Sequence, residues 1–66
     1  MTRFEKDLEE AKKDAFMAVE ILRERDAEIT KLEDELRKTK NGFRRTCIKQ
    51  EIDRLTEQFE EIDKWA

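Results

Sequence analysis

The sequence predicts an all-α fold: a coiled coil that folds back on itself as an antiparallel helix–turn–helix hairpin and self-associates. Three observations predict it. Hydrophobic residues recur with a seven-residue period along most of the chain. The period changes phase by two residues on passing Gly42, which is the only glycine. Half of the 66 residues are charged and none is proline, which is typical of long helices with solvated surfaces.

The first hydrophobic repeat predicts one helix from residue 2 to residue 40. Its seam comprises Met1, Phe4, Leu8, Ala11, Ala15, Ala18, Leu22, Ile29, Leu32, Leu36 and Phe43. Thr2 and Glu5 are spaced as a capping box at the start of this helix. Asn41 and Gly42 tolerate the left-handed conformation that often closes a helix, so we expect a turn over residues 41–44.

The second repeat predicts a helix over residues 45–65. Its seam comprises Ile48, Ile52, Leu55, Phe59, Ile62 and Ala66. A two-residue shift rotates the apolar stripe of a straight helix by roughly 150–160°, so one straight helix does not keep both seams on one side. Antiparallel pairing of the seams is centred on Gly42, which favours a hairpin within one 1–66 module. The expected core is Ile29, Leu32, Leu36, Ile48, Ile52, Leu55, Phe59 and Ile62.

A long parallel coiled-coil dimer with a local break near residues 41–47 is the alternative. Such a rod would be about 95 Å long at 1.5 Å per residue. Its interhelical charges give a mixed result. Asp7 would face Lys12 favourably, whereas Glu28 would face Glu33. The hairpin is the fold we expect.

The first seventeen residues have no partner inside the expected hairpin, because they project beyond the end of the second helix. Burying a side chain such as Phe or Leu is worth roughly 1.5–3 kcal/mol, which disfavours a solvated seam. Residues 15–22 are apolar on nearly all sides, so we expect a further element to pack there, with Trp65 close by. We expect a second copy of the chain or a partner helix to bind a surface that consists of Phe4, Leu8, Ala11, Ala15, Phe16, Val19 and Leu22.

Six cations and no acid lie between Leu36 and Gln50. They are Arg37, Lys38, Lys40, Arg44, Arg45 and Lys49. One interpretation is a basic tip that binds an acidic cytoskeletal surface, an anionic membrane or nucleic acid. The other, which we favour, is that the cations complement a helix C-terminus and solvate a turn. Arg44 and Arg45 oppose the dipole of the helix that they begin, which keeps the first interpretation open.

Arg25 occupies a seam position opposite Phe59. Three interpretations apply to it: a polar layer that sets the register, a guanidinium stacked on the aromatic ring, or a side chain that extends its charge to water. Cys47 lies off both seams, and we interpret it as incidental.

The sequence contains no catalytic or metal-binding pattern. Histidine, serine and tyrosine are absent, and a single cysteine without histidine excludes most transition-metal sites. The carboxylates follow helical spacing and indicate a solvated face rather than a desolvated cleft that would tune their acidity. We expect no enzymatic activity, no cofactor, no small-molecule substrate and no transmembrane segment. The absence of a signal-peptide pattern and of a disulfide framework favours a cytoplasmic location.

The segment Ile29–Lys40, ITKLEDELRKTK, resembles tropomyosin, myosin rod and similar cytoskeletal or tethering coiled coils. This resemblance implies an oligomerisation or scaffolding module within a larger cytoskeletal, centrosomal or trafficking protein. The last six residues, Glu61–Ala66, resemble the membrane-proximal epitope of the HIV envelope transmembrane subunit, in which a leucine replaces Ile62. That resemblance would imply an engineered epitope carrier. The hairpin gives Trp65 a packing role of its own, and we favour that interpretation.

Overall fold

The chain folds into three α-helices and contains no strand. A computed structural model describes residues 1–66. The helices are α1 (Arg3–Lys13), α2 (Ala15–Lys38) and α3 (Gly42–Asp63). The predicted all-α class is therefore confirmed.

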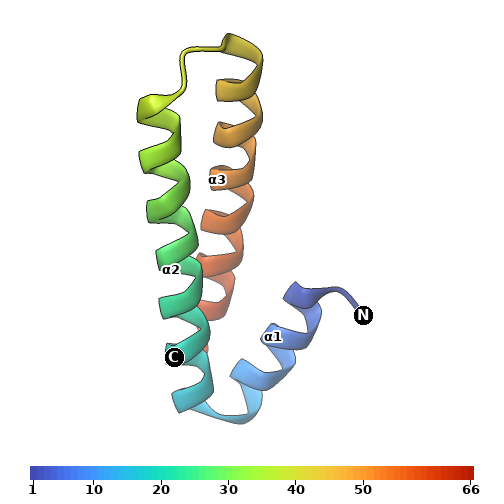
Figure 1. Cartoon of the computed structure of the whole chain (residues 1–66). Coiled ribbons are helices and arrows are strands. Elements are labelled where there is room, and N and C mark those ends of the chain that lie inside the picture. The colour runs from blue at the N-terminus through green and yellow to red at the C-terminus, as the bar shows by residue number, and fades with distance from the viewer.

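The two long helices, α2 and α3, lie side by side and run in opposite directions (Figure 1). The short helix α1 folds back from the start of α2 and contacts both long helices near the end where α2 begins and α3 finishes (Figure 1). The molecule measures 42 × 20 × 15 Å along its principal axes. Its length is thus set by the long pair, and α1 widens one end.

A single residue, Asp14, separates α1 from α2, so the prediction of one helix over residues 2–40 is wrong at this point. Asp14 is extended, with φ −150° and ψ 117°, and its carboxylate accepts a hydrogen bond from the Phe16 amide at 2.9 Å. This carboxylate caps the N-terminus of α2. The Asp14 amide still donates to the Glu10 carbonyl, and its carbonyl accepts from Ala18. The backbone hydrogen bonds of α1 therefore end at Asp14, and those of α2 begin at the same residue.

The break lets α1 bury its own seam, which corrects the expectation that residues 1–17 project without an internal partner. Ala11 is buried, and Phe4 and Leu8 pack against the apolar cluster. The other buried members of that cluster are Ala18, Ile21, Leu22 and Ile62. Ile21 lies off the predicted seam, in the segment where a further element was expected to pack. Its cluster includes Ala11 of α1.

The connection between α2 and α3 also differs from the predicted turn. It spans Thr39–Asn41, and α3 begins at Gly42 rather than at residue 45. No residue has a positive φ, so the left-handed closing conformation expected at Asn41-Gly42 is absent. Asn41 instead caps α3, because its side-chain oxygen accepts a hydrogen bond from the Arg44 amide at 3.1 Å.

The predicted core residues differ in how deeply they are buried. Ile48, Leu55 and Ile62 of α3 are buried. The half-buried ones are Ile29, Leu32, Leu36, Ile52 and Phe59. Burial is deepest where α1 covers the long pair, and it thins toward the connection between α2 and α3.

Replacement of Gly42 by alanine tests the local geometry of this connection. A Cβ atom at Gly42 meets no atom within 4 Å, and the residue is the first of a helix with ordinary negative φ. Gly42→Ala should therefore raise the free energy of unfolding by roughly 0.4–1 kcal/mol, since alanine loses less backbone entropy on folding. Urea denaturation followed by circular dichroism measures the change. A loss of stability would show that Gly42 needs a conformation that alanine resists.

Candidate protein-binding surface

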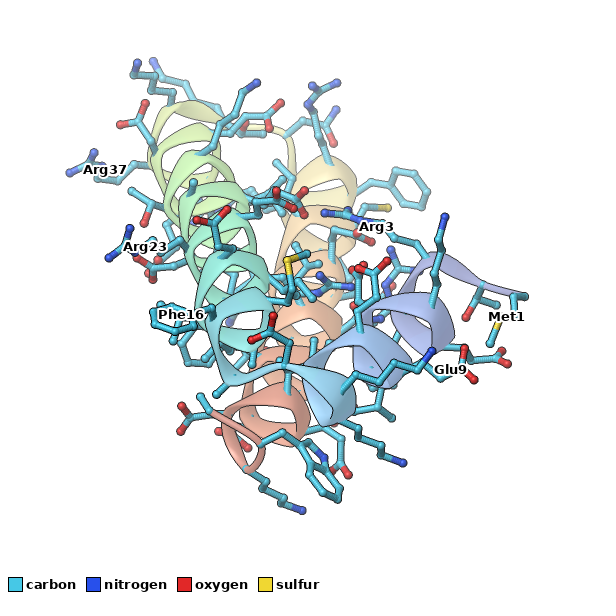
Figure 2. The ribbon with its side chains drawn as sticks, turned by 90° about the horizontal axis from the view of Figure 1, so that it is seen from below. Met1, Arg3, Glu9, Phe16, Arg23 and Arg37 are labelled. Carbon is cyan, nitrogen blue, oxygen red and sulfur yellow. The ribbon has the colours of Figure 1, made fainter.

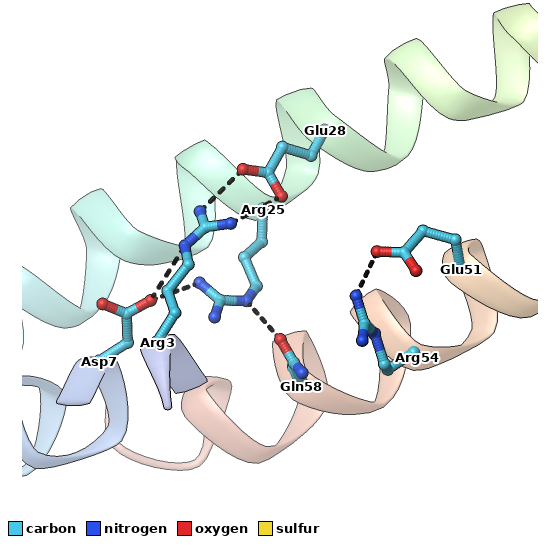
Figure 3. Close-up of polar contacts among 7 residues, drawn as sticks. All are labelled: Arg3, Asp7, Arg25, Glu28, Glu51, Arg54 and Gln58. Carbon is cyan, nitrogen blue, oxygen red and sulfur yellow. Dashed lines mark hydrogen bonds and ion pairs between the residues drawn. The ribbon is translucent and has the colours of Figure 1, made fainter. Parts of the chain in front are cut away.

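A buried arginine joins all three helices at one point (Figure 3). Arg25 of α2 is only 1% exposed. Its Nη1 donates to Asp7 Oδ2 of α1 at 2.8 Å, and its Nε donates to Gln58 Oε1 of α3 at 3.0 Å. No buried side-chain nitrogen or oxygen lacks a hydrogen-bond partner. The guanidinium is therefore held inside the molecule, and of the three interpretations of Arg25 the polar layer agrees with this geometry.

A second arginine strengthens the attachment of α1 at its exposed edge. Arg3 makes a two-pronged contact with Glu28 of α2, with nitrogen–oxygen distances of 2.7 and 3.3 Å (Figure 3). This hydrogen bonding raises the pKa of Arg3 above its ordinary value, while partial desolvation acts in the opposite direction. Arg3 Nε also lies 3.8 Å from Asp7 Oδ2. The Asp7 carboxylate is thus placed between two guanidinium groups, and α1 is held by charge as well as by its apolar seam.

The structure divides the seven residues of the predicted partner-binding surface into two groups. Phe4, Leu8, Ala11 and Leu22 lie in or against the chain's own apolar cluster. Ala15, Phe16 and Val19 are exposed. Phe16 is 84% exposed, the highest value for any large hydrophobic residue in the chain. The exposed part of the predicted partner-binding surface is therefore on α2.

The exposed face of α2 carries a regular stripe around Phe16. At 3.6 residues per turn, Phe16, Glu20, Arg23 and Ala27 fall within about 60° of one another. All four are exposed, and the stripe lies roughly 180° from the buried face that contains Ala18 and Arg25. Figure 2 shows Phe16 and Arg23 on the same side of α2, directed away from α1. We call these four residues the outer stripe.

Most of the six cations near the connection form hydrogen bonds or ion pairs within the chain. Arg45 Nη1 donates to the Leu36 carbonyl at 2.7 Å and to the Thr39 carbonyl at 2.9 Å, so it satisfies the end of α2. Arg44 Nη2 pairs with Glu35 at 3.0 Å. These contacts give both arginines a structural role, although they oppose the dipole of α3.

Two more of these cations pair with one carboxylate. Lys38 and Arg37 both bind Asp34. Their hydrogen bonds, that of Lys38 first, hold the pKa of Asp34 below its ordinary value of 3.8. Any stability from this exposed group is therefore present above that ordinary value and is lost as the pH falls through the lower folded one. Of the six cations, only Lys40 and Lys49 make no side-chain hydrogen bond or ion pair at all, which leaves a small charge for an anionic partner.

A shallow groove beside the connection between α2 and α3 is lined in part by the exposed side chain of Phe43. Its volume is about 520 Å³, and Leu32, Phe43, Cys47 and Ile48 supply its apolar lining. Phe43 is 81% exposed, and Cys47 is a free, exposed thiol. At the opposite end, Lys12 Nζ lies 5.1 Å from the centroid of the Trp65 ring, which links α1 to the C-terminal turn.

Sequence reasoning identified Arg25 as unusual but did not identify Asp7 and Gln58 as its partners. The signal was indirect: an arginine in an apolar seam requires an acceptor, and Asp7 precedes the seam residue Leu8. Gln58 likewise precedes the seam residue Phe59. A search for acceptors adjacent to seam positions would have found both residues.

Comparison with protein-family models, with curated proteins and with solved structures finds no match to this chain. No helix is long and apolar enough to cross a membrane. No group of three or more histidine, cysteine or acidic side chains is placed to hold a metal ion.

The attachment of α1 is tested by Asp7→Ala. The substitution leaves the Arg25 guanidinium buried with only Gln58 as its partner, so we expect the free energy of unfolding to fall by roughly 2–4 kcal/mol. Asp34→Ala is the matched control, since it removes an equally well paired but exposed aspartate. It should leave the urea midpoint nearly unchanged. Equal effects of the two substitutions would contradict the special role of the buried pair.

Proposed function

We propose that this chain is a self-associating helical module that mediates protein–protein association, with the outer stripe of α2 as its contact surface. In this proposal α2 and α3 form the hairpin of a coiled-coil scaffold, and the partner is a second copy of the chain. The observation that carries the proposal is the exposure of Phe16, 84%, on a helix face with no cover in the monomer. A large solvated aromatic side chain favours burial against another protein.

Charge complementarity favours a second copy as the occupant. In a two-fold contact, if one residue of the first copy meets a second residue of the other copy, the reverse pair also forms. The contact surface must therefore be complementary to itself. If two α2 helices cross antiparallel about a point between residues 21 and 22, Glu20 faces Arg23 of the second copy. The same register places Phe16 against Ala27 of the second copy, so an aromatic ring meets a small residue. The outer stripe is therefore complementary to itself in both charge and size.

The acidic and basic residues of the stripe also explain why the module would be a scaffold rather than an enzyme in this proposal. They lie on an open helix face and are suited to pairing across a contact. The resemblance of Ile29–Lys40 to rod-like coiled coils supports the same class. A role inside a larger cytoskeletal, centrosomal or trafficking protein in the cytoplasm is consistent with it.

Phe16→Glu is the direct test. In sedimentation equilibrium, the apparent mass of the wild-type protein should rise with concentration from 8.0 kDa toward twice that value. Phe16→Glu should weaken the association by at least tenfold, because it places a second acid beside Glu20 and removes the aromatic contact. A monomeric wild type at several hundred micromolar would contradict the proposal.

Phe43→Glu provides the matched control for that experiment. Phe43 is 81% exposed and, like Phe16, is the second residue of its helix, where glutamate suits the positive end of the dipole. Its change should leave the association constant unaffected. The double variant Glu20→Arg/Arg23→Glu should associate like wild type, whereas Arg23→Glu alone should not.

The alternative function is a coiled-coil stalk whose basic end binds an anionic partner. The observation that favours it is the presence of two exposed lysines without hydrogen-bond or ion-pair partners, Lys40 and Lys49, at the end of the molecule that also carries the exposed Phe43. Lys40→Glu/Lys49→Glu tests it without removing the carbonyl contacts of Arg45. If the stalk function holds, wild type binds vesicles containing anionic lipid, or a polyanion such as heparin, in a salt-sensitive manner and the double variant does not. If the scaffold function alone holds, neither protein binds, and their self-association is the same.

A further inference from the structure

We propose that the groove between α2 and α3 that holds α1 also accepts α1 of a second copy, so that two chains exchange this helix. In the exchanged form, α1 and α2 of each chain join into one continuous helix, and each α1 packs on the other chain. The occupant is thus a second copy of this chain, bound by a surface different from the outer stripe. The proposal goes beyond the proposed function and does not depend on it.

The joint at Asp14 is the first observation that carries this inference. Helical hydrogen bonding reaches Asp14 from Glu10 and restarts at Asp14 toward Ala18. Only the amides of Ala15, Phe16 and Met17 lack their partners four residues back, and the Asp14 carboxylate serves the Phe16 amide. Conversion to a continuous helix therefore forms three backbone hydrogen bonds and gives up one cap. The joint contains neither glycine nor proline, so no helix-breaking residue opposes the continuous form.

The hydrophobic repeat is the second observation. The seam runs through the joint without a change of phase, from Phe4 and Leu8 to Ala18 and Leu22. A sequence selected only for the bent form has no need to keep this period across the bend. The period suits a straight helix whose α1 portion extends beyond its own chain and packs elsewhere.

The contacts that hold α1 are the third observation. They consist of an apolar seam and two ion pairs, Arg25–Asp7 and Arg3–Glu28. None depends on the two helices being joined at Asp14, since the same atoms meet if α1 comes from another chain. At 11 residues, α1 is shorter than helices that persist alone in water, so it needs such a groove in either form. Exchange of an identical element through a short joint is a recognised route to dimers.

The exchanged form has a measurable shape. A continuous helix over residues 3–38 is about 54 Å long at 1.5 Å per residue. The longest dimension of the closed chain is 42 Å. An exchanged dimer is therefore longer than the monomer as well as twice as heavy.

Ala15→Pro separates the two forms. Proline suits the first residue of a helix, and the residue before it is restricted to extended conformations such as that of Asp14. The variant should keep the closed monomer but block the continuous helix. Asp14→Ala should do the opposite, because it removes the cap of α2. Both are compared in a Phe16→Glu background, so that contacts through the outer stripe do not contribute.

In that background we expect Ala15→Pro to reduce the dimer fraction at least tenfold and Asp14→Ala to raise it, as measured by light scattering coupled to size exclusion. An unchanged dimer fraction in Ala15→Pro, or a dimer of Asp14→Ala no longer than the closed chain in small-angle scattering, would overturn the inference. If the outer stripe does not associate at all, Phe16→Glu behaves like wild type and this comparison remains decisive.

A charge-reversal mixture gives an independent result. Asp7→Arg alone and Arg25→Asp alone each place like charges at the buried contact. In an exchanged heterodimer, both contacts regain opposite charges. Mixing the two variants should therefore raise helicity and give a species of about twice 8.0 kDa. The double variant Asp7→Arg/Arg25→Asp is the control for folding of the reversed pair.

If the double variant folds and the mixture stays as weakly helical and as light as its separate components, α1 does not exchange. If the double variant does not fold, the Ala15→Pro comparison decides, because it leaves the Arg25–Asp7 pair intact.

Discussion

The hydrogen bonds of one buried guanidinium determine how the three helices are arranged. Arg25 of α2 is the only buried charged residue, and its guanidinium bonds to Asp7 of α1 and to Gln58 of α3. A charge at this depth is stable only if its acceptors are present, so burial of Arg25 requires α1 to return to the long pair. Once α1 is there, its apolar seam covers Ile21 and Leu22. The polar contact thus specifies an arrangement that the apolar cluster then stabilises.

The return of α1 in turn depends on Asp14, which converts a helical seam into two helices at the cost of three backbone hydrogen bonds. The cost is partly offset, since the Asp14 carboxylate accepts a hydrogen bond from one of the three freed amides, that of Phe16. The same joint separates the closed chain from the exchanged pair that we propose. A closed chain buries its own seam, and an exchanged pair buries the same seam between two chains. The outer stripe remains exposed in both, so association through Phe16 is compatible with either state.

Several parts of this structure follow from the sequence, and others do not. The seven-residue period determines the helical class, because apolar residues at that spacing lie on one face of a helix. The break at Asp14 was not predictable from the same pattern, since no glycine or proline marks it and the seam keeps its phase. Two residues carried a signal of it: Ile21, apolar but off the seam, and Arg25, charged but on it. Both residues indicate that a third helix packs against them. The seven-residue period alone predicts that the residues of this helix continue α2 in a straight line.

The candidate site shows the same division. The exposure of Phe16 follows from the helical period, as it lies opposite the seam. The roles of Arg44 and Arg45 did not follow, because the carbonyl groups that Arg45 serves belong to the end of a different helix. The sequence shows how many cations lie near the turn. Which groups they bind depends on how the chain reverses direction there.

Native-state hydrogen exchange on Arg25→Leu is the measurement that tests the central claim most directly. Without the guanidinium, Asp7 and Gln58 lose their shared partner, and the account predicts that amides of α1 lose most of their protection. Amides of α3 near Ile48, which lies beside the connection between α2 and α3, should remain protected. Protection of α1 equal to that of wild type would contradict the claim that Arg25 holds the three helices together.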